Sequence, residues 1–348
     1  MDYKAIADLV LNRLKQSQGD GRWDDHLSLN TWEWPQGVAM YAMLKVYQAT
    51  KDENLLDEIE AWYDGHIGRG LPGRNINTTA PMLGLTLLYE ARKKEKYLPV
   101  ISAWAEWVMN GLPRTEEGGF QHITSDCLNE QQLWDDTLFM TVLFLYRAGC
   151  ALNRPDWQSE AKYQFLLHIK YLHCAGTGLW YHGWCFIGRH HFGQAFWARG
   201  NSWFTAGAID FVEWLPQDDP VRRIVLGTWQ EQCLSLLKAQ DPATGLWHTL
   251  VDHPDSYLET SASAAIAYGL LKGSRLGLLS CRDQAMKAAE GVLAQVGPDG
   301  LVGGVSYGTP MGNDLDFYRN IPIRPTAYGQ GLTFLMLTEL LLPQPDAR

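Results

Sequence analysis

Long apolar segments are absent from this sequence. No apolar run approaches the roughly 18 residues that a membrane-spanning helix needs, so we expect no membrane partner. The first residues, MDYKAIADLVLNRLKQ, carry a charge at the second position and lack the apolar stretch of a signal peptide, so we expect none. Together these absences predict a protein of the cytoplasm.

Positive charge and paired cysteines are also scarce. The 29 Lys and Arg residues face 39 Asp and Glu residues, which gives a formal net charge of -10 and argues against a nucleic-acid partner. The six cysteines are scattered without a C-x-x-C pair, which indicates reduced thiols rather than a disulfide framework or a zinc site. No cluster of metal ligands and no Walker-type glycine loop is visible. We therefore expect neither a metal nor another cofactor.

A linker rich in Pro, Gly or Ser is missing as well, so we expect one domain over residues 1–348. Helical periodicity dominates the chain. It predicts helices near residues 2–17, 35–50, 53–64, 78–93, 96–110, 134–152, 155–172, 201–214, 219–239, 259–273, 280–295 and 327–342. Strand signals are weak and local, at residues 179–182 and 246–250.

The predicted helices alternate between two kinds. A helix with one polar face lies at a surface, and a helix that is apolar all round is buried. Pairs of one buried and one surface helix predict an all-α fold, an (α/α)6 barrel of six inner and six outer helices. A superhelical array of helical hairpins is the alternative, although the pairs have unequal loops and share no repeat signature. The surface helices begin near residues 2, 53, 96, 155, 219 and 280, and the buried helices near 35, 78, 134, 201, 259 and 327.

Tryptophan and tyrosine are abundant, with 15 residues of each. Some of them pack the interior, and others stand with polar residues in the loops before the predicted inner helices. If the inner helices share a direction, these loops converge on one mouth of the barrel. Aromatic faces beside polar groups suit the C–H faces and hydroxyls of sugars, so we predict a carbohydrate-binding pocket there. The loops are 32–36, 75–79, 131–136, 197–203, 257–261 and 324–330.

Two carboxylates, Asp135 and Asp136, stand side by side at the start of the predicted helix 134–152. The helix dipole and free N–H groups explain one acid in a first helical turn better than they explain two. Successive side chains on an α-helix diverge by about 100°, so only one of the pair needs to face the pocket. We expect burial among aromatic side chains to raise the pKa of that aspartate toward the range of a proton donor.

Arg199 lies between two tryptophans in the segment WARGNSW. One interpretation is an ion pair between helices. The other is a clamp for a substrate carboxylate or hydroxyl, for which a planar guanidinium is suited. The flanking Trp197 and Trp203 favour the clamp.

Two histidines also precede predicted inner helices. His122 lies in GGFQH and His182 in WYHGW. A single histidine is more often structural, but two beside one mouth point to function. His190 and His191 are adjacent, so their side chains diverge, and we do not expect a metal pair there.

Several motifs together resemble glycoside hydrolase family 105, the unsaturated rhamnogalacturonyl hydrolases, which are related to the unsaturated glucuronyl hydrolases of family 88. The resemblance runs from Trp34 to the C-terminal helix. The W-x-D of residues 134–136 and the W-x-R-G-N of residues 197–201 are its most specific parts, and its implied fold is the (α/α)6 barrel. The motifs are QQLWDDTLFM, WARGNSW, GLWYHGW, GGFQH and YLETSASA.

The resemblance implies hydration of a double bond. Its substrate is an oligosaccharide with a 4,5-unsaturated uronic acid at the non-reducing end, the product of a pectin lyase. One aspartate protonates C4 and assists water at C5, and the resulting hemiketal opens and expels the remaining chain. The W-x-D spacing makes Asp136 that aspartate, with Asp135 as the x. We expect Asp135 to act as a helix-start cap or as an orienting neighbour. The family's substrate contacts match His122, Trp134, His182, Trp197 and Arg199, and the mouth loops add Trp34, Asn77, Asp135, Asn201, Trp203 and Glu259 as candidates.

The chain departs from this family in two places. Many members have an acidic residue before the second inner helix, where this chain has Asn77. An asparagine can hold a hydroxyl but cannot carry charge or share a proton. The loop after Tyr-His-x-Trp is acidic in many members, whereas residues 185–189 read CFIGR. Both departures concern the choice of sugar rather than the barrel or the hydration chemistry.

Two alternative functions remain. An inverting glycosidase or a sugar epimerase can use the same barrel, and an inverting glycosidase needs a second carboxylate roughly 6.5–9.5 Å from Asp136. Glu33 and Glu259 are candidates in other mouth loops. A non-catalytic carbohydrate-binding or scaffold protein does not need Asp136 enclosed by Trp and His, so an Asp136 on the outer surface would favour it.

Overall fold

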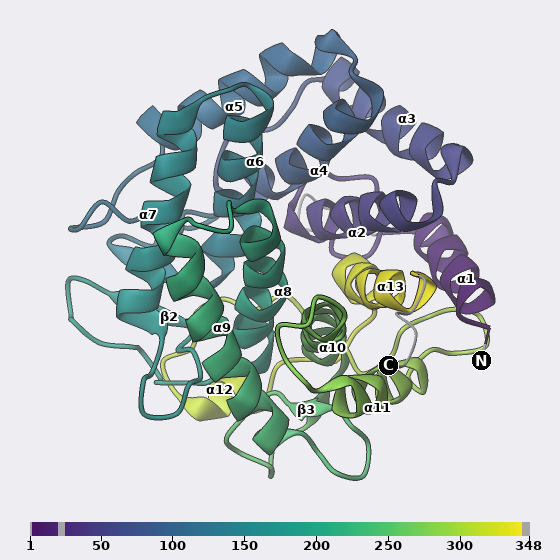
Figure 1. The fold of residues 1–348 in the computed structure, drawn as a ribbon, viewed down its shortest axis with the longest axis vertical. Coiled ribbons are helices and arrows are strands. Elements are labelled where there is room, and N and C mark those ends of the chain that lie inside the picture. The colour runs from purple at the N-terminus through teal and green to yellow at the C-terminus, as the bar shows by residue number, and fades with distance from the viewer. Residues whose placement is uncertain (1, 20–24, 343–348) are drawn as a thin grey trace.

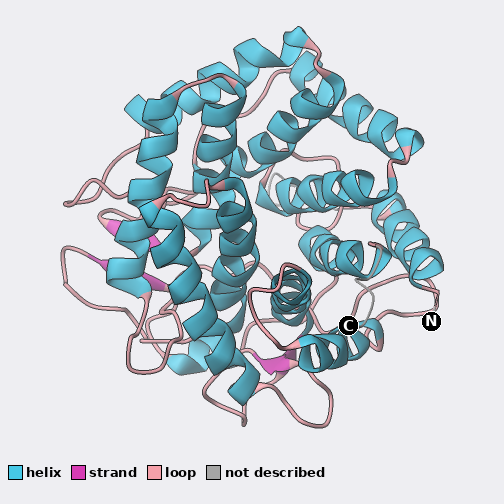
Figure 2. Cartoon of the chain, in the orientation of Figure 1, coloured by secondary structure: helices cyan, strands magenta, loops and turns pink. Residues whose placement is uncertain are grey.

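The computed structural model describes residues 2–19 and 25–342. Helices make up most of it, as Figure 2 shows. The inner helices are α2 (Trp34–Thr50), α4 (Ile76–Arg92), the π-helical turn η2 (Leu138–Val142) that continues into α6 (Leu143–Ala151), α8 (Ala198–Trp214), α10 (Thr260–Arg275) and α13 (Ala327–Leu341). The outer helices are α1 (Tyr3–Gln16), α3 (Glu53–Arg69), α5 (Leu98–Asn110), α7 (Pro155–Leu172), α9 (Pro220–Ala239) and α11 (Arg282–Leu293).

The inner helices form a closed ring (Figure 1). In order, α2 packs against α4, α4 against η2 and α6, η2 against α8, α8 against α10, and α10 against α13. The ring closes because α13 packs against α2, so the last inner helix meets the first. A superhelical array would keep these two helices apart. The predicted all-α (α/α)6 barrel is therefore confirmed.

Small residues allow the inner helices to approach one another closely. A Cβ atom on Gly37 of α2 would lie 2.6 Å from the backbone nitrogen of Pro81 in α4. A Cβ atom on Gly331 of α13 would lie 2.9 Å from the Cα atom of Ala39 in α2. Protein interiors are close-packed, so a larger residue at either position would push two helices apart. The small, apolar character seen in the sequence thus sets the spacing of the ring.

Short strands support the loops at one end of the ring. β1 (Gln132–Trp134) pairs antiparallel with β2 (Gly183–Cys185), and β3 (Trp247–His248) pairs with β4 (Leu258–Glu259). The strand predicted at 246–250 is confirmed at its centre, whereas the one predicted at 179–182 lies further along, at β2. Two short helices, η1 (Glu95–Tyr97) and α12 (Leu315–Arg319), were not expected as separate elements.

The start of the helix predicted at 134–152 was placed too early. Trp134 belongs to β1, a turn follows at Asp135, and the chain becomes helical at Asp136. The first turns are then the π-helix η2, a form that often occurs at functional sites. Pairing of Trp134 with Gly183 in β2 keeps this residue in an extended conformation, which the helical periodicity did not reveal.

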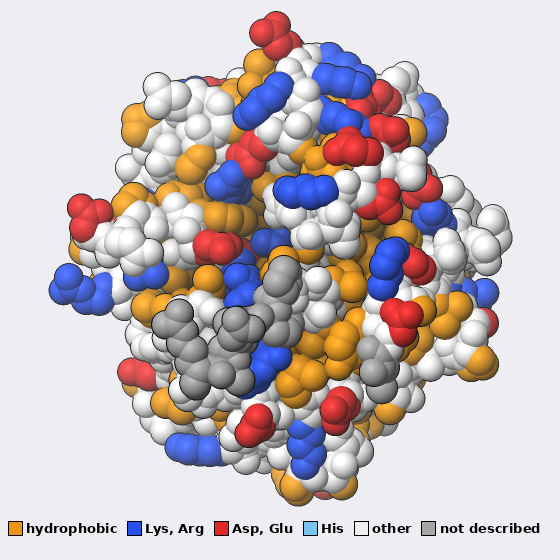
Figure 3. All heavy atoms as spheres, turned by 45° about the vertical axis from the view of Figure 1, so that its right-hand side comes forward, with side chains coloured by type: hydrophobic (Ala, Val, Ile, Leu, Met, Phe, Trp, Pro, Cys, Tyr) orange, Lys and Arg blue, Asp and Glu red, His pale blue; other side chains and the backbone are white. Residues whose placement is uncertain are grey.

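The surface is consistent with the acidic composition. On the face that Figure 3 shows, acidic and basic side chains are interspersed. Among the residues that the structure describes, no helix is both long and apolar enough to cross a membrane.

Candidate active site

A cavity of about 510 Å³ opens where the inner helices begin. Its lining comes from the loops before α2, α4, η2, α8 and α13, so segments far apart in the sequence share one site. Predicted residues that line the cavity are Trp34, Asn77, His122, Trp134, Asp136, Trp197 and Arg199. The prediction that six mouth loops converge on one pocket is confirmed for the loops 32–36, 75–79, 131–136 and 197–203, whereas no residue of 257–261 or 324–330 lines the cavity and residues 307–313 do so instead.

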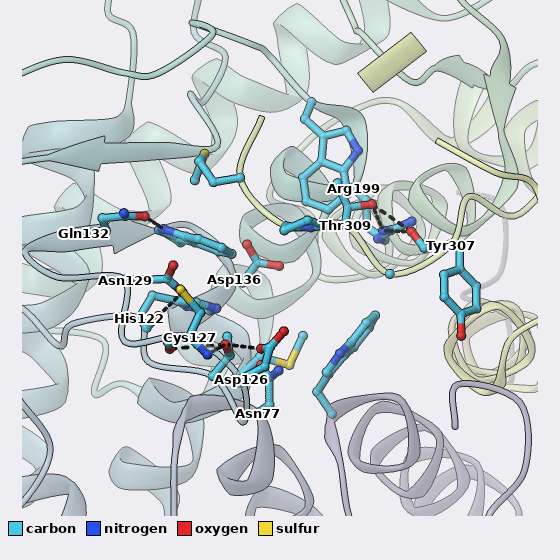
Figure 4. Close-up of a pocket in the computed structure, with 18 of the residues that line it drawn as sticks. Asn77, His122, Asp126, Cys127, Asn129, Gln132, Asp136, Arg199, Tyr307 and Thr309 are labelled. Atoms are coloured by element: carbon cyan, nitrogen blue, oxygen red, sulfur yellow. Dashed lines mark hydrogen bonds between the residues drawn. The ribbon is translucent and has the colours of Figure 1, made fainter. Parts of the chain in front are cut away.

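Asp136 faces this cavity from the start of η2 (Figure 4). One of its carboxylate oxygens, Oδ2, lies 3.2 Å from Nε2 of His182, and its side chain keeps 15% of its exposure. Burial alone would raise its pKa, but the contact with His182 outweighs burial and lowers it to about 2. The expected raised pKa of the pocket-facing aspartate is therefore wrong for Asp136, because a histidine stabilises its ionised form.

Asp135 lies behind the cavity wall and is fully buried. Within the described part of the chain, neither of its side-chain oxygens has a hydrogen-bond partner. It packs against Gly200 at the start of α8, where a Cβ atom would lie 2.3 Å from Oδ2. Burial and the neighbouring Asp136 carboxylate raise the pKa of Asp135 well above its ordinary value. The predictions that Asp135 lines the pocket and that its side chain caps the helix are wrong, and the alternative, an orienting neighbour of Asp136, stays a prediction.

The two aspartates therefore hold one proton between them near neutral pH. Two carboxyl groups this close do not ionise together, and their protons come off in separate steps that belong to the pair. The raised pKa of Asp135 and the lowered pKa of Asp136 favour the proton on Asp135 and the negative charge on Asp136, which faces the cavity. A proton and a base are thus both available at one place.

His182 connects Asp136 to a tyrosine that the sequence analysis missed. Nδ1 of His182 lies 2.7 Å from the hydroxyl of Tyr318 in α12. That hydroxyl accepts a hydrogen bond of 3.1 Å from the backbone N–H of Gly312, so its own proton is available for Nδ1. The arrangement favours the tautomer with hydrogen on Nε2, the nitrogen that lies 3.2 Å from Oδ2 of Asp136. Tyr318 has no signal in the sequence because it lies in a short helix between α11 and α13.

His122 packs against the indole ring of Trp134. Its ring stacks on the indole at 4.2 Å with an interplanar angle of 9°, and its Nδ1 lies 2.8 Å from the hydroxyl of Thr137. Burial lowers the pKa of His122 to about 3, so the ring is neutral at physiological pH. His122 thus presents a flat, uncharged wall to the cavity.

Arg199 lines the cavity while holding a loop in place. Its terminal nitrogens donate to the backbone carbonyls of Ser306 and Tyr307, at 2.9 and 3.0 Å, and to the Thr309 hydroxyl at 2.8 Å. The guanidinium lies over the rings of Trp197 and Tyr328, at 4.5 and 5.0 Å. One of these nitrogens also lies 3.9 Å from Oε1 of Glu259, so the ion-pair interpretation is confirmed. The N–H groups hold residues 306–309, and the clamp for a substrate stays a prediction.

Three other predicted substrate contacts are buried behind the lining, and those predictions are wrong. Asn201 exchanges hydrogen bonds with the backbone of Trp180, at 2.8 and 2.9 Å. Trp203 packs edge-on against Trp34. Glu259 accepts hydrogen bonds from the backbone N–H groups of Ala262 and Ser306, at 2.6 and 2.8 Å. Each contacts a residue or loop that does line the site, in the case of Asn201 through a hydrogen bond of 2.9 Å to the backbone carbonyl of Trp197. His182 is also almost fully buried and reaches the cavity through Asp136.

The sequence analysis did not predict the remaining lining residues as substrate contacts. Most lie in loops without helical periodicity, and the Gly, Pro and Asn content of residues 308–313 was their one available signal. They are His26, Glu33, Thr124, Asp126, Cys127, Asn129, Gln132, Met140, Phe192, Tyr307, Gly308, Thr309, Pro310, Met311 and Asn313. Glu33 was expected here, but as the second carboxylate of an alternative enzyme.

One group in the described chain could hold a metal ion. Ligand atoms of Asp135, Asp136 and His182 lie within 4.8 Å of one another. The expectation that no ligand cluster exists is therefore wrong. The expectation that the reaction needs no metal stays a prediction. His190 and His191 are not part of this group.

An (α/α)6 barrel with a carboxylate and histidines set among tryptophans defines a class, the helical-barrel enzymes that act on carbohydrates. The model of Glycosyl Hydrolase Family 88 matches residues 6–342, and the chain belongs to this family of glycoside hydrolases. Unsaturated rhamnogalacturonyl hydrolase YesR of Bacillus subtilis is 33% identical over 313 residues, which cover 89% of this chain and 90% of that protein.

Solved structures show the same relationship. A possible member of family GH105 from Salmonella enterica serovar Paratyphi A is 44% identical, with a TM-score of 0.95 over 98% of this chain and 93% of that one. A possible GH105 member from Klebsiella pneumoniae is 43% identical, with a TM-score of 0.94 over 98% of this chain and 93% of that one. An unsaturated glucuronyl hydrolase from Bacillus sp. GL1 is 20% identical with a TM-score of 0.72, over 97% of this chain and 95% of that one, and shares the fold.

Proposed function

We propose that this glycoside hydrolase removes a 4,5-unsaturated uronic acid from the non-reducing end of rhamnogalacturonan-type oligosaccharides. The observation that carries the proposal is Asp136, a carboxylate that faces an aromatic cavity and shares one proton with the buried Asp135. The name and coverage of the Bacillus subtilis relative support the choice of substrate.

The reaction begins with a proton delivered to C4 of the unsaturated sugar. The enol-ether π electrons form the new C4–H bond, and positive charge develops at C5, next to the ring oxygen. Asp136 delivers this proton after drawing on the one it shares with Asp135. The carboxylate of Asp136 then takes a proton from the water that adds at C5. The hemiketal so formed opens, and the remaining oligosaccharide leaves.

The other residues of the cavity position the sugar. Trp34, Trp134 and Trp197 offer flat faces for the C–H groups of the ring, while Asn77 offers an amide for a hydroxyl. Arg199 supplies positive charge for the uronate carboxylate and fixes the loop 306–309. His182 orients Asp136 and stabilises it in its ionised form.

We also infer that the enzyme acts as one domain in the cytoplasm, without a nucleic-acid or membrane partner. The six cysteines are free in the structure, although Cys127 and Cys150 are exposed. Exposed thiols persist in a reducing compartment. The degradation of oligosaccharides imported into a cell fits this location.

Loss of ultraviolet absorbance by the enol ether tests the proposed function. Purified protein should consume the unsaturated disaccharide of uronate and rhamnose faster than unsaturated disaccharides from hyaluronan or chondroitin. The saturated analogue of the pectin disaccharide should remain intact. Cleavage of the saturated analogue would instead favour an inverting glycosidase, for which Glu33 is the candidate second carboxylate because it lines the same cavity.

A further inference from the structure

We propose that Asp126 selects substrates in which the sugar next to the unsaturated uronate carries no charge. This inference rests on the proposed function, because the neighbouring sugar is the one that the reaction releases. Asp126 lies in the loop that leads into β1, and its side chain lines the cavity.

The loop holds the Asp126 carboxylate in a defined place. The hydroxyl of Thr124 donates a hydrogen bond of 2.7 Å to Oδ1 of Asp126. The same hydroxyl accepts a hydrogen bond of 3.1 Å from the backbone N–H of Cys127. The backbone N–H of Thr124 donates a hydrogen bond of 2.9 Å to the Cys127 carbonyl. This turn directs the carboxylate into the cavity, between Asp136 and Asn77 in the view of Figure 4.

The charges around the cavity are unequal. Its carboxylates are Glu33, Asp126 and Asp136, and Arg199 is the sole Lys or Arg among the described lining residues. His122 adds no positive charge, since burial lowers its pKa to about 3. One uronate carboxylate can be balanced by Arg199. Beyond Arg199, the described lining offers a second anionic group on the substrate no Lys or Arg, and His26 is the one further imidazole there.

Exposure places Asp126 on the outer part of the cavity. Glu33 is 7% exposed and the side chain of Asp136 keeps 15% of its exposure, whereas Asp126 is exposed. The terminal sugar must reach Asp136, so the rest of the oligosaccharide leaves through the outer part, past Asp126. A carboxylate or sulfate on the next sugar would meet a like charge there, in surroundings less screened than bulk water.

A matched pair of ligands tests the charge directly. Unsaturated digalacturonate carries a carboxylate on its second sugar, and the methyl ester at that carboxylate removes the charge without changing the sugar. For the wild-type enzyme, kcat/KM should be roughly tenfold higher for the ester, because one close like-charge pair is removed. Asp126→Asn should bring this ratio close to one, and added salt should reduce it in the wild type.

Glu130→Gln is the matched control. Glu130 is exposed in the same loop and is not among the lining residues, so this variant loses the same charge but should keep the wild-type ratio. A ratio in Asp126→Asn equal to that of the wild type, or an equal fall in Glu130→Gln, would overturn the proposed role of Asp126.

Binding separates this inference from the proposed function. Dissociation constants of both ligands are measured by calorimetry for the wild type and for Asp126→Asn. If the unsaturated uronate–rhamnose disaccharide keeps its double bond but the digalacturonate ester binds more tightly only when Asp126 is present, the proposed function fails and the charge selection stands. If that disaccharide is consumed but the two digalacturonate ligands show equal affinity and equal kcat/KM, the charge selection fails and the proposed function stands.

Discussion

Two buried carboxyl sites inside the barrel differ in how well their oxygens are partnered. Asp210 lies toward the end of α8, away from the mouth, and accepts hydrogen bonds from Tyr41, from Tyr268 at 2.7 Å, and from Lys272, with Lys45 at 3.3 Å. At the mouth, the oxygens of Asp135 have no hydrogen-bond partner among the described residues. A fully partnered carboxylate stabilises a fold, and an under-partnered one indicates function.

The same comparison appears in the pKa values. Burial alone would raise the pKa of Asp210, but the charges of Lys272 and Lys45 hold it well below its ordinary range. Asp210 is therefore a fixed anion. At the mouth, opposite shifts on two adjacent aspartates leave one proton that can move. On this comparison, Asp210 contributes mainly to stability and the two aspartates at the mouth contribute to catalysis. The following substitutions test both roles.

The largest effect on catalysis is expected for Asp136→Asn. The amide keeps the shape of the side chain but cannot give a proton to carbon or take one from water, so kcat should fall by roughly 10³-fold. Stability at pH 7 should also fall, because the lowered pKa of Asp136 means that its ionised form stabilises the fold above the unfolded pKa of about 3.9. Single-turnover kinetics and thermal melts measure both quantities. A variant with near wild-type kcat would remove Asp136 from the chemistry.

The largest effect on stability is expected for Asp210→Asn. Loss of this charge leaves Lys272 and Lys45 without their shared buried partner, which should lower the free energy of unfolding by about 3–5 kcal/mol. The kcat of the folded protein should stay close to wild type, because Asp210 is remote from the mouth. Urea unfolding and assays at low temperature check this. Unchanged stability would contradict the structural role.

A smaller and pH-dependent effect is expected for Asp135→Asn. The folded protein raises the pKa of Asp135, so its contribution to stability is present below the unfolded pKa of about 3.9 and is lost as pH rises toward the folded pKa. The variant should therefore be more stable than wild type at pH 7, and the difference should shrink near pH 4. Its kcat should fall less than that of Asp136→Asn.

Urea unfolding at the two pH values measures this difference. The result that would contradict it is a loss of about 1 kcal/mol at both pH values, which is typical of a lost helix cap. The sequence alone had favoured such a cap, and the structure reverses the expected sign.

The smallest effect is expected for Tyr318→Phe. Loss of the hydroxyl removes the hydrogen bond to Nδ1 of His182, so the ring can adopt the tautomer that turns a lone pair toward Asp136. A lost hydrogen bond of this kind costs about 1 kcal/mol, so kcat should fall by roughly fivefold. Nitrogen NMR of His182 should show the tautomer change. An unchanged tautomer would contradict the positioning role of Tyr318.

The sequence predicted the barrel because helical periodicity and the alternation of apolar and charged helices are local signals. It also predicted the convergence of Trp34, His122, Asp136 and Arg199, since each lies just before an inner helix. It did not predict that Trp134 is extended, because strand β2, some 50 residues later, imposes this conformation.

The missed and misassigned residues have a common physical cause. Tyr318 and the loop 307–313 approach the mouth only through tertiary contacts, such as the hydrogen bonds from Arg199 to Tyr307 and Thr309. Asn201 and Glu259 have the same polar character as true lining residues, and their burial depends on how the backbone turns. The lowered pKa of Asp136 likewise depends on His182, which no spacing in the sequence places next to it.

Incorporation of deuterium tests the central claim most directly. The wild-type enzyme is incubated with an unsaturated uronate–rhamnose disaccharide in D2O, the product is reduced at once with borohydride, and the position of carbon-bound deuterium is determined by NMR. Hydration of the double bond by Asp136 predicts one deuterium at C4 of the released uronate, and none in the Asp136→Asn variant. Release of the sugar without deuterium at C4 would show direct cleavage of the glycosidic bond and contradict the account.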